Sequence, residues 1–178
     1  SKGPLLSVPP VIDGSLIDLS GNIIDSYLAA RILDYIRKEL LALKVGFTFE
    51  TVMSHESKVK FLKDAQEQGY RTYLYFVTTE DPDINVDRVK QRVKNGGHPV
   101  EENKIRERYF RSMEMLIDAI EVSDRAFLYD NSSNAVDQSV SYICEVTNGD
   151  TLTINPCFKG DFPIWFEKYV LVHLVDED

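Results

Sequence analysis

The sequence has few of the residues that build metal centres or disulfide frameworks. Its 178 residues include two cysteines and three histidines, scattered along the chain. Two thiols do not define a disulfide framework in a chain of this length, so we expect Cys144 and Cys157 to be free. Scattered histidines and cysteines do not make a metal site either. The composition therefore points to chemistry that needs neither group.

Long apolar runs and nucleophile motifs are also missing. No apolar run approaches the roughly 18 residues of a transmembrane helix, and no signal peptide opens the chain, so we expect a cytoplasmic protein without membrane contact. There is no Gly-x-Ser-x-Gly elbow and no catalytic cysteine signature. An apolar content of 43% is ordinary for a globular protein, and the length suits one domain over residues 1–178.

Strand-like and helix-like patterns alternate along the chain. Residues 71–77 and 125–129 are apolar strands, and the first of them is expected at the centre of a sheet. This alternation predicts an α/β fold with a mostly parallel sheet and helices on both faces. The other expected elements are a hairpin at 11–19, a helix at 23–44 stopped by Gly46, a strand at 46–50, and a helix at 55–68 capped by Ser54 and closed by Gly69.

The last part of the chain has a different pattern. Asn148-Gly149 lies between two apolar runs, which predicts a C-terminal β-hairpin. We interpret residues 133–178 as a hairpin extension of the same domain. Trp165 follows the hairpin and is expected in the core, not as a platform for a ligand.

A basic segment at 88–111 stands out from this acidic chain, whose net charge is −9. It holds five Arg and three Lys against three Glu. Arg88 and Arg92 share one side of a predicted helix, Gly96-Gly97 must leave helical geometry, and Lys104, Arg108 and Arg111 share one stripe of a second helix. Guanidinium groups on both sides of a loop that can close suit a phosphorylated ligand. The alternative is that these side chains are solvated helix faces.

Polar residues follow three of the expected strands, where ligands bind in α/β sheets. They are Glu50, Thr51 and Ser54, then Thr78-Thr79-Glu80, and then Asp130, Asn131 and Ser132. Glu50 can accept from a substrate hydroxyl, or it can pair with a nearby lysine. Asn131 and Ser132 can contact a base, or they can form a simple turn.

Residues 27–132, with their Gly-Gly-His-x-Val and Arg-Tyr-x-Arg elements, resemble the zeta-toxin-like P-loop kinases of bacteria. The resemblance implies a three-layer P-loop kinase fold and ATP- and Mg²⁺-dependent phosphorylation of a small hydroxylated substrate. In the toxin branch that substrate is a UDP-N-acetyl amino sugar. It also implies that Glu50, with Thr51 and Ser54 beside it, contacts substrate, and that Arg92, Arg108 and Arg111 hold the phosphates. Asp130, Asn131 and Ser132 would lie near the nucleotide, and an antitoxin protein is an open partner.

One part of the family pattern is missing. The sequence contains no Gly-x-x-x-x-Gly-Lys-Ser/Thr loop, which would supply the phosphate-cradling backbone donors. We expect the native protein to carry this segment ahead of Ser1, since a parallel sheet without its first strand exposes an edge. The alternatives are a non-catalytic nucleotide- or anion-binding regulatory module, or an RNA-binding module. The acidic net charge disfavours a nucleic acid partner.

Overall fold

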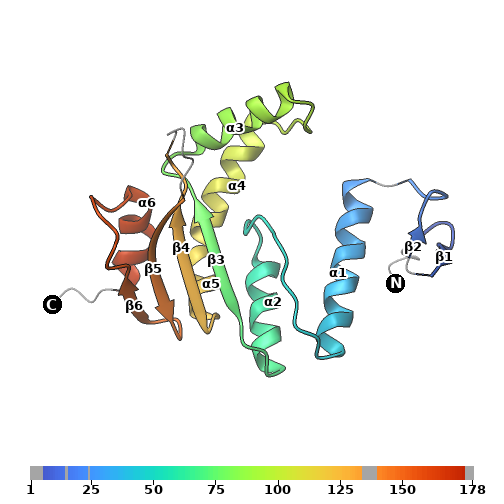
Figure 1. Cartoon of the computed structure of the whole chain (residues 1–178), viewed down its shortest axis with the longest axis horizontal. Coiled ribbons are helices and arrows are strands. Elements are labelled where there is room, and N and C mark those ends of the chain that lie inside the picture. Colours follow the sequence, from blue (N-terminus) through green and yellow to red (C-terminus); the bar gives the residue numbers. More distant parts are fainter. Residues whose placement is uncertain (1–5, 15, 24, 134–139, 175–178) are drawn as a thin grey trace. The chain divides into compact units, whose positions relative to one another are not determined.

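The computed structural model describes residues 6–14, 16–23, 25–133 and 140–174. Its contacts divide the chain into two compact units, Ser1–Phe49 and Glu50–Asp178 (Figure 1). A single domain over residues 1–178 stays a prediction.

The first unit contains a hairpin and one long helix. Strands β1 (Val11–Asp13) and β2 (Leu16–Asp18) pair antiparallel, which confirms the hairpin expected around Asp13-Gly14. Helix α1 (Ser26–Ala42) begins after Asp25, whose carboxylate accepts from the amide of Leu28 at 2.7 Å. This cap explains why the helix begins three residues later than the apolar pattern suggests.

Lys44, and not Gly46, ends helix α1. Lys44 takes a left-handed conformation with φ of 58°, and its amide donates to the carbonyl of Leu41 at 3.1 Å. The amide of Val45 donates to the carbonyl of Leu40, which completes a Schellman motif. The predicted stop at Gly46 was therefore wrong by two residues, because local hydrogen bonds decided which residue left the helix.

The strand expected at residues 46–50 is absent. Residues 45–54 lie in neither a helix nor a strand, and they belong to neither sheet of the described chain. An apolar run becomes a strand only when another strand supplies a hydrogen-bonding partner. The pattern in Phe47 to Phe49 does not reveal whether such a partner is in place.

The second unit is built on a four-stranded sheet with the order β3-β4-β5-β6. Its strands are β3 (Tyr73–Thr78), β4 (Arg125–Asp130), β5 (Ser141–Thr147) and β6 (Thr151–Ile154). Only β3 and β4 are parallel, and the other two pairings are antiparallel. The expected mostly parallel sheet was thus wrong for the described strands, because only the β3–β4 connection is a helical crossover. Strand β3, expected at the centre, lies at the edge of this sheet.

The C-terminal hairpin is confirmed. Strands β5 and β6 pair through Thr147↔Thr151, and Asn148 and Gly149 both have positive φ, as a type I′ turn requires. A side chain at Gly149 would place its Cβ 2.9 Å from the backbone of Glu121. The turn therefore needs glycine for its conformation and also for its close approach to the preceding helix.

Helices α2 (Glu56–Glu67), α3 (Pro82–Lys94), α4 (Glu102–Glu114) and α5 (Leu116–Glu121) precede β4, and a continuous helical segment follows β6. That segment consists of α6 (Ile164–Phe166), the π-helix η1 (Glu167–Leu171) and α7 (Val172–Leu174).

His55, and not the expected Ser54, caps α2 through its ring nitrogen, and Gly69 closes the helix as expected, with φ of 85°. No helix in the described ranges is long and apolar enough to cross a membrane.

One face of this sheet carries the core of the unit. Along β3, Leu74, Phe76 and Thr78 are buried, whereas Tyr73, Tyr75 and Val77 are exposed. Helices α4 and α5 lie behind the sheet in Figure 1, and the same core includes side chains of α2 and the C-terminal helices. The prediction of helices on both faces does not hold for the described part of this unit. Its buried core consists mainly of Leu74, Phe76, Met113, Leu116, Ile120, Leu128, Ile143, Val146, Trp165, Phe166 and Val170.

Candidate functional site

The basic segment folds as a helix, a loop and a second helix, as the sequence predicted. Helix α3 begins after Asp81, whose carboxylate accepts from the amide of Asp83 at 2.7 Å, and Pro82 takes the first helical position. Two ion pairs join the helices: Lys90 with Glu102 at 2.9 Å, and Arg106 with Asp83. Charges that the sequence shows as a cluster are therefore partly used to hold α3 against α4.

The Gly-Gly loop is tied to the end of α3 by a Schellman motif. Gly96 has φ of 84°, and the amide of Gly97 donates to the carbonyl of Arg92 at 2.9 Å. A Cβ on Gly97 would lie 2.5 Å from Cγ of Arg92, so only glycine fits there. The guanidinium of Arg92 donates to the carbonyl of His98 at 3.1 Å. Arg92 therefore contacts the loop, and its contact with phosphates stays a prediction.

Tyr109 fastens α4 to the carboxyl end of β3. Its hydroxyl donates to the carbonyls of Thr79 at 2.9 Å and of Glu80 at 3.2 Å. Burial raises the pKa of this hydroxyl, so Tyr109 remains a neutral donor at any working pH. Tyr109 is buried, in line with its helical spacing from the buried Met113. The pattern did not reveal its hydrogen bonds.

The arginines of the basic segment have different surroundings. Arg88 is half-buried and donates to the carbonyl of Asn131 at 2.6 Å, which ties α3 to the end of β4. Arg111 is exposed and lies 3.6 Å from the carboxylate of Glu107. Arg108 is half-buried, and its side chain forms neither a hydrogen bond nor an ion pair within the described residues. Of the three arginines predicted to hold phosphates, Arg108 is thus the one with all its donors available.

Asp130 and Ser132 belong to a ring of hydrogen bonds. The carboxylate of Asp130 accepts from the indole of Trp165 at 2.9 Å and from the hydroxyl of Ser132 at 2.8 Å. The hydroxyl oxygen of Ser132 accepts from the amide of Glu80 at 2.6 Å. The carboxylate of Glu80 accepts from the amide of Ile164 at 2.9 Å, and Ile164 precedes Trp165. The ring closes over the ends of β3 and β4.

Asn131 lies between those two residues but uses only its backbone. Its amide donates to the carbonyl of Thr78 at 2.7 Å, and its carbonyl accepts from Arg88. Its half-buried side chain forms no hydrogen bond in the described part of the chain. Contact of Asp130, Asn131 and Ser132 with a nucleotide stays a prediction. Of these three residues, Asn131 has a side-chain amide without a hydrogen bond in the described part of the chain.

The predicted substrate residues lie ahead of α2. In Figure 1, α2 runs alongside β3 in the opposite direction, so its amino end lies at the same end of the sheet as the carboxyl end of β3. Glu50 and Thr51 are exposed and Ser54 is half-buried. Within the described ranges, no hydrogen bond or ion pair joins them to α3 or α4. Their contact with substrate stays a prediction.

Glu80 and Trp165 are the site residues whose roles the sequence did not indicate. Glu80 had been noted only as a polar residue at a strand end. Trp165 was expected in the core, and its exposed fraction of 2% confirms this. The one signal for its second role is the indole N–H, because a buried donor of this kind usually has a hydrogen-bond partner. Sequence position could not identify that partner, which lies 35 residues away.

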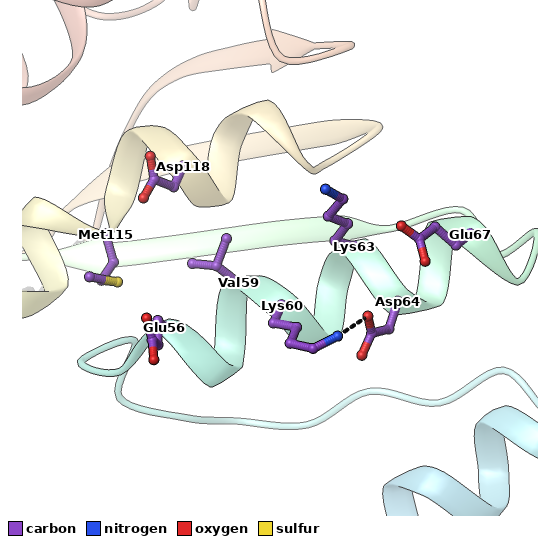
Figure 2. A pocket seen from close by; sticks show the side chains of 8 residues that line it. All are labelled: Glu56, Val59, Lys60, Lys63, Asp64, Glu67, Met115 and Asp118. Atoms are coloured by element: carbon purple, nitrogen blue, oxygen red, sulfur yellow. Dashed lines mark hydrogen bonds and ion pairs between the residues drawn. The ribbon is translucent and has the colours of Figure 1, made fainter.

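A shallow groove between α2 and α5 differs from the basic segment in the charge of its side chains (Figure 2). Lys60 donates to Asp64 at 2.6 Å, and this contact raises the pKa of Lys60. Carboxylates outnumber the lysines among the lining residues, so the groove does not favour an anionic ligand. The lining residues are Glu56, Val59, Lys60, Lys63, Asp64, Glu67, Met115 and Asp118, none of which the sequence had suggested for the site.

Comparison with known proteins relates the chain to bacterial sequences. An uncharacterized protein of Haemophilus influenzae is 35% identical over 65 residues, which are 36% of this chain and 46% of the relative. The chain thus spans about half the length of the curated relative that it matches. No solved structure matches the chain. The profile of the zeta toxin family, a family of P-loop kinase-like proteins, matches residues 26–139, well over half of the chain. The chain therefore belongs to the zeta toxin family.

Proposed function

We propose that this protein is an ATP-dependent kinase that transfers a phosphoryl group to the hydroxyl of a small molecule. A UDP-N-acetyl amino sugar is the substrate class that the family resemblance suggests. Membership of the zeta toxin family supports phosphotransferase chemistry, and it supports a role as the toxin of a toxin–antitoxin pair. Both the substrate and the antitoxin partner belong to the proposal.

The observation that carries the proposal is the state of Arg108. It lies on α4 beside Tyr109, which is bonded to the end of β3, so the backbone that carries Arg108 is held in place. The neighbouring Arg88, Arg92 and Arg106 donate to protein groups, whereas Arg108 has no such partner within the described ranges. A half-buried guanidinium without a partner is suited to an anionic group from a ligand.

The residues present fit one part of ATP. Arg108 and the exposed Lys104 are cations on one face of α4, and guanidinium and ammonium groups match phosphate oxygens. The sequence has no Walker A motif to cradle the remaining phosphates. Among the described residues no group of three or more His, Cys, Asp or Glu side chains is arranged to hold a metal, so these residues do not by themselves form a site for Mg²⁺.

ATP, when bound, would supply the phosphoryl group, and the roles of the protein residues follow from their chemistry. Arg108 would donate to the oxygens of that group and stabilise the charge that develops as it moves. The loop held by Arg92 would cover the site and limit access of water. Arg111 would contribute positive charge, and Glu50 would accept a hydrogen bond from the substrate hydroxyl.

Single-turnover phosphoryl transfer by the native protein tests the role of Arg108. We expect Arg108→Ala to lower turnover roughly 10³–10⁵-fold, or about 4–7 kcal/mol, as for arginines that stabilise phosphoryl transfer. Arg108→Lys should not restore the rate, because a point charge cannot replace a planar pair of donors. Thermal melting should show that both variants remain folded.

Arg71→Ala is the matched control. Arg71 is exposed and precedes β3, at the opposite end of the sheet from Arg108's anchor, so its loss should leave turnover unchanged. A folded Arg108→Ala variant with near-native turnover would contradict the proposed role. Native protein that transfers no phosphoryl group from ATP would contradict the proposed function itself.

A specific observation favours a second candidate, a non-catalytic anion- or nucleotide-binding regulatory module. The sequence has no Walker A motif, yet the arginine-bearing helices are in place. In that case Arg108→Ala would weaken ligand binding, and no phosphorylated product would form with the native protein. The same experiment therefore separates the two candidates.

A further inference from the structure

The ring of hydrogen bonds over the ends of β3 and β4 connects the C-terminal helix to the candidate site. Trp165 is buried, and its indole N–H has the Asp130 carboxylate as its partner at 2.9 Å. The neighbouring amide of Ile164 reaches Glu80 from the same helix. Two consecutive residues of the helix thus hold Asp130, at the end of β4, and Glu80, just after β3.

We propose that Trp165 is a positioning residue for the candidate site, holding the Asp130–Ser132 turn and, through it, the arginine helices. The expected effect of Trp165 on catalysis rests on the proposed function, whereas its expected effect on the structure of the site does not. Phe76 and Phe166 lie beside Trp165 in the core and lack a side-chain donor, so the indole N–H distinguishes Trp165 from them.

The carboxylate of Asp130 accepts three hydrogen bonds. One of its oxygens accepts from the Trp165 indole and the Ser132 hydroxyl, and the other accepts from the Ser132 amide at 2.9 Å. A carboxylate with three donors is held in one orientation. Asp130 therefore orients the turn from Asp130 to Ser132. Trp165 supplies the one of its three donors that comes from outside the turn.

The Asp130–Ser132 turn holds the arginine-bearing helices α3 and α4 through two sets of hydrogen bonds. The Asn131 carbonyl, between Asp130 and Ser132, accepts from Arg88 on α3. The Ser132 hydroxyl accepts from the Glu80 amide, and the Glu80 carbonyl accepts from Tyr109 on α4, one residue from Arg108. Loss of the indole donor should thus change the position of Arg108 through this chain of hydrogen bonds, although Trp165 does not contact Arg108.

A structural experiment tests the positioning role independently of activity. Trp165 is the single tryptophan, so its indole N–H gives one resonance in a ¹⁵N spectrum of the full chain. We expect Trp165→Phe to shift the amide resonances of Glu80 and Ser132. The control Phe166→Leu, which alters a fully buried neighbour without a polar atom, should leave those two resonances in place. Equal shifts in the two variants would overturn the proposal.

Turnover by the native protein tests the functional consequence. Trp165→Phe should lower kcat about 10- to 100-fold with little change in KM, whereas Phe166→Leu should not, even if it melts at a lower temperature. In an Asp130→Ala background, Trp165→Phe should have no further effect, because both changes remove the same bond. Additive losses would mean that Trp165 acts only through packing, and they would overturn the proposal. Failure of the native protein to use ATP would reject the proposed function, while the resonance shifts would still decide the positioning role.

Discussion

At the scale of the residue, side chains of one type have different tasks because their partners differ. Arg88 donates to a backbone carbonyl, Arg106 pairs with Asp83, and Arg108 has no partner in the described part of the chain. Arginine is always charged, so its availability to a ligand depends on which acceptors surround it. This selection could not be read from the sequence, where the three residues are equivalent members of a basic cluster.

Asp124 provides a test of a half-buried carboxylate at the end of the sheet opposite the candidate site. One oxygen of its carboxylate accepts from the amide of Thr72 at 2.7 Å and from the side chain of Gln66 at 3.3 Å. The Thr72 amide is the main reason that the pKa of Asp124 lies below its ordinary value. We expect Asp124→Ala to lower the free energy of unfolding by about 1–3 kcal/mol at neutral pH.

The loss should shrink in acid. A depressed folded-state pKa stabilises the protein above the unfolded-state pKa, about 3.9 for Asp, and that stabilisation disappears as the pH falls through the lower folded-state value. Urea unfolding of both proteins at neutral pH and at about pH 2.5 measures the difference. Asp161→Ala, at an exposed carboxylate without a hydrogen bond in the described chain, is the control. A gap that stays constant with pH would contradict this account.

At the scale of the element, helices were easier to predict than their ends. Apolar periodicity indicated α1 and α2. However, the left-handed residue that ends α1 is Lys44 where Gly46 was expected, and the residue that caps α2 is His55 where Ser54 was expected. Gly69 was identified correctly because glycine in the left-handed conformation is the commonest helix stop. Cap choice depends on differences of about 1 kcal/mol, which the surrounding hydrogen bonds can reverse.

Gly97→Ala tests the loop between α3 and α4. The new Cβ would meet Cγ of Arg92 at 2.5 Å and the Arg92 carbonyl at 2.8 Å, so the loop must shift and the Schellman motif must weaken. We expect a loss of about 1–2 kcal/mol in the free energy of unfolding and faster hydrogen exchange of the residue 97 amide. Thermal melting and exchange measured together would detect both.

Gly46→Ala is the matched control for this substitution. Gly46 does not have a positive φ, and a Cβ there has nothing within 4 Å, so its effect should stay within about 0.5 kcal/mol. If Gly97→Ala melted like the parent protein and kept its amide protected, the loop would be able to accept a side chain. The close approach to Arg92 would then have no role in closing the loop.

At the scale of the whole molecule, the sequence contains some of the elements that bind phosphate in P-loop kinases and lacks another. The arginine-bearing helices are formed and anchored, but the sequence contains no Walker A motif. We expect calorimetry to show that the 178-residue chain binds ATP–Mg²⁺ no more tightly than about millimolar, because backbone donors of that loop supply much of the phosphate affinity. Sub-millimolar affinity in this chain would contradict the expectation. Arg108→Ala would then show whether α4 provides the site.

The candidate site was predictable in its parts but not in its connections. The sequence indicated the basic helix–loop–helix, the polar residues after the strands, and Trp165 in the core. It did not indicate that Trp165 and Glu80 would meet in one ring with Asp130 and Ser132. Glu80 and Ser132 are 52 residues apart, and no local pattern records a contact over that separation.

The sequence by itself determined most of the local elements and the family, although not the strand expected at residues 46–50. Alternating apolar residues favour strands, spacing of three and four favours helices, and Asn148-Gly149 favours a tight hairpin, because each follows from backbone geometry over a few residues. Tertiary structure alone decided the direction of the strand pairings, the edge position of β3, and the different surroundings of the arginines. These depend on which distant groups pack and exchange hydrogen bonds, and such contacts have no fixed spacing along the chain.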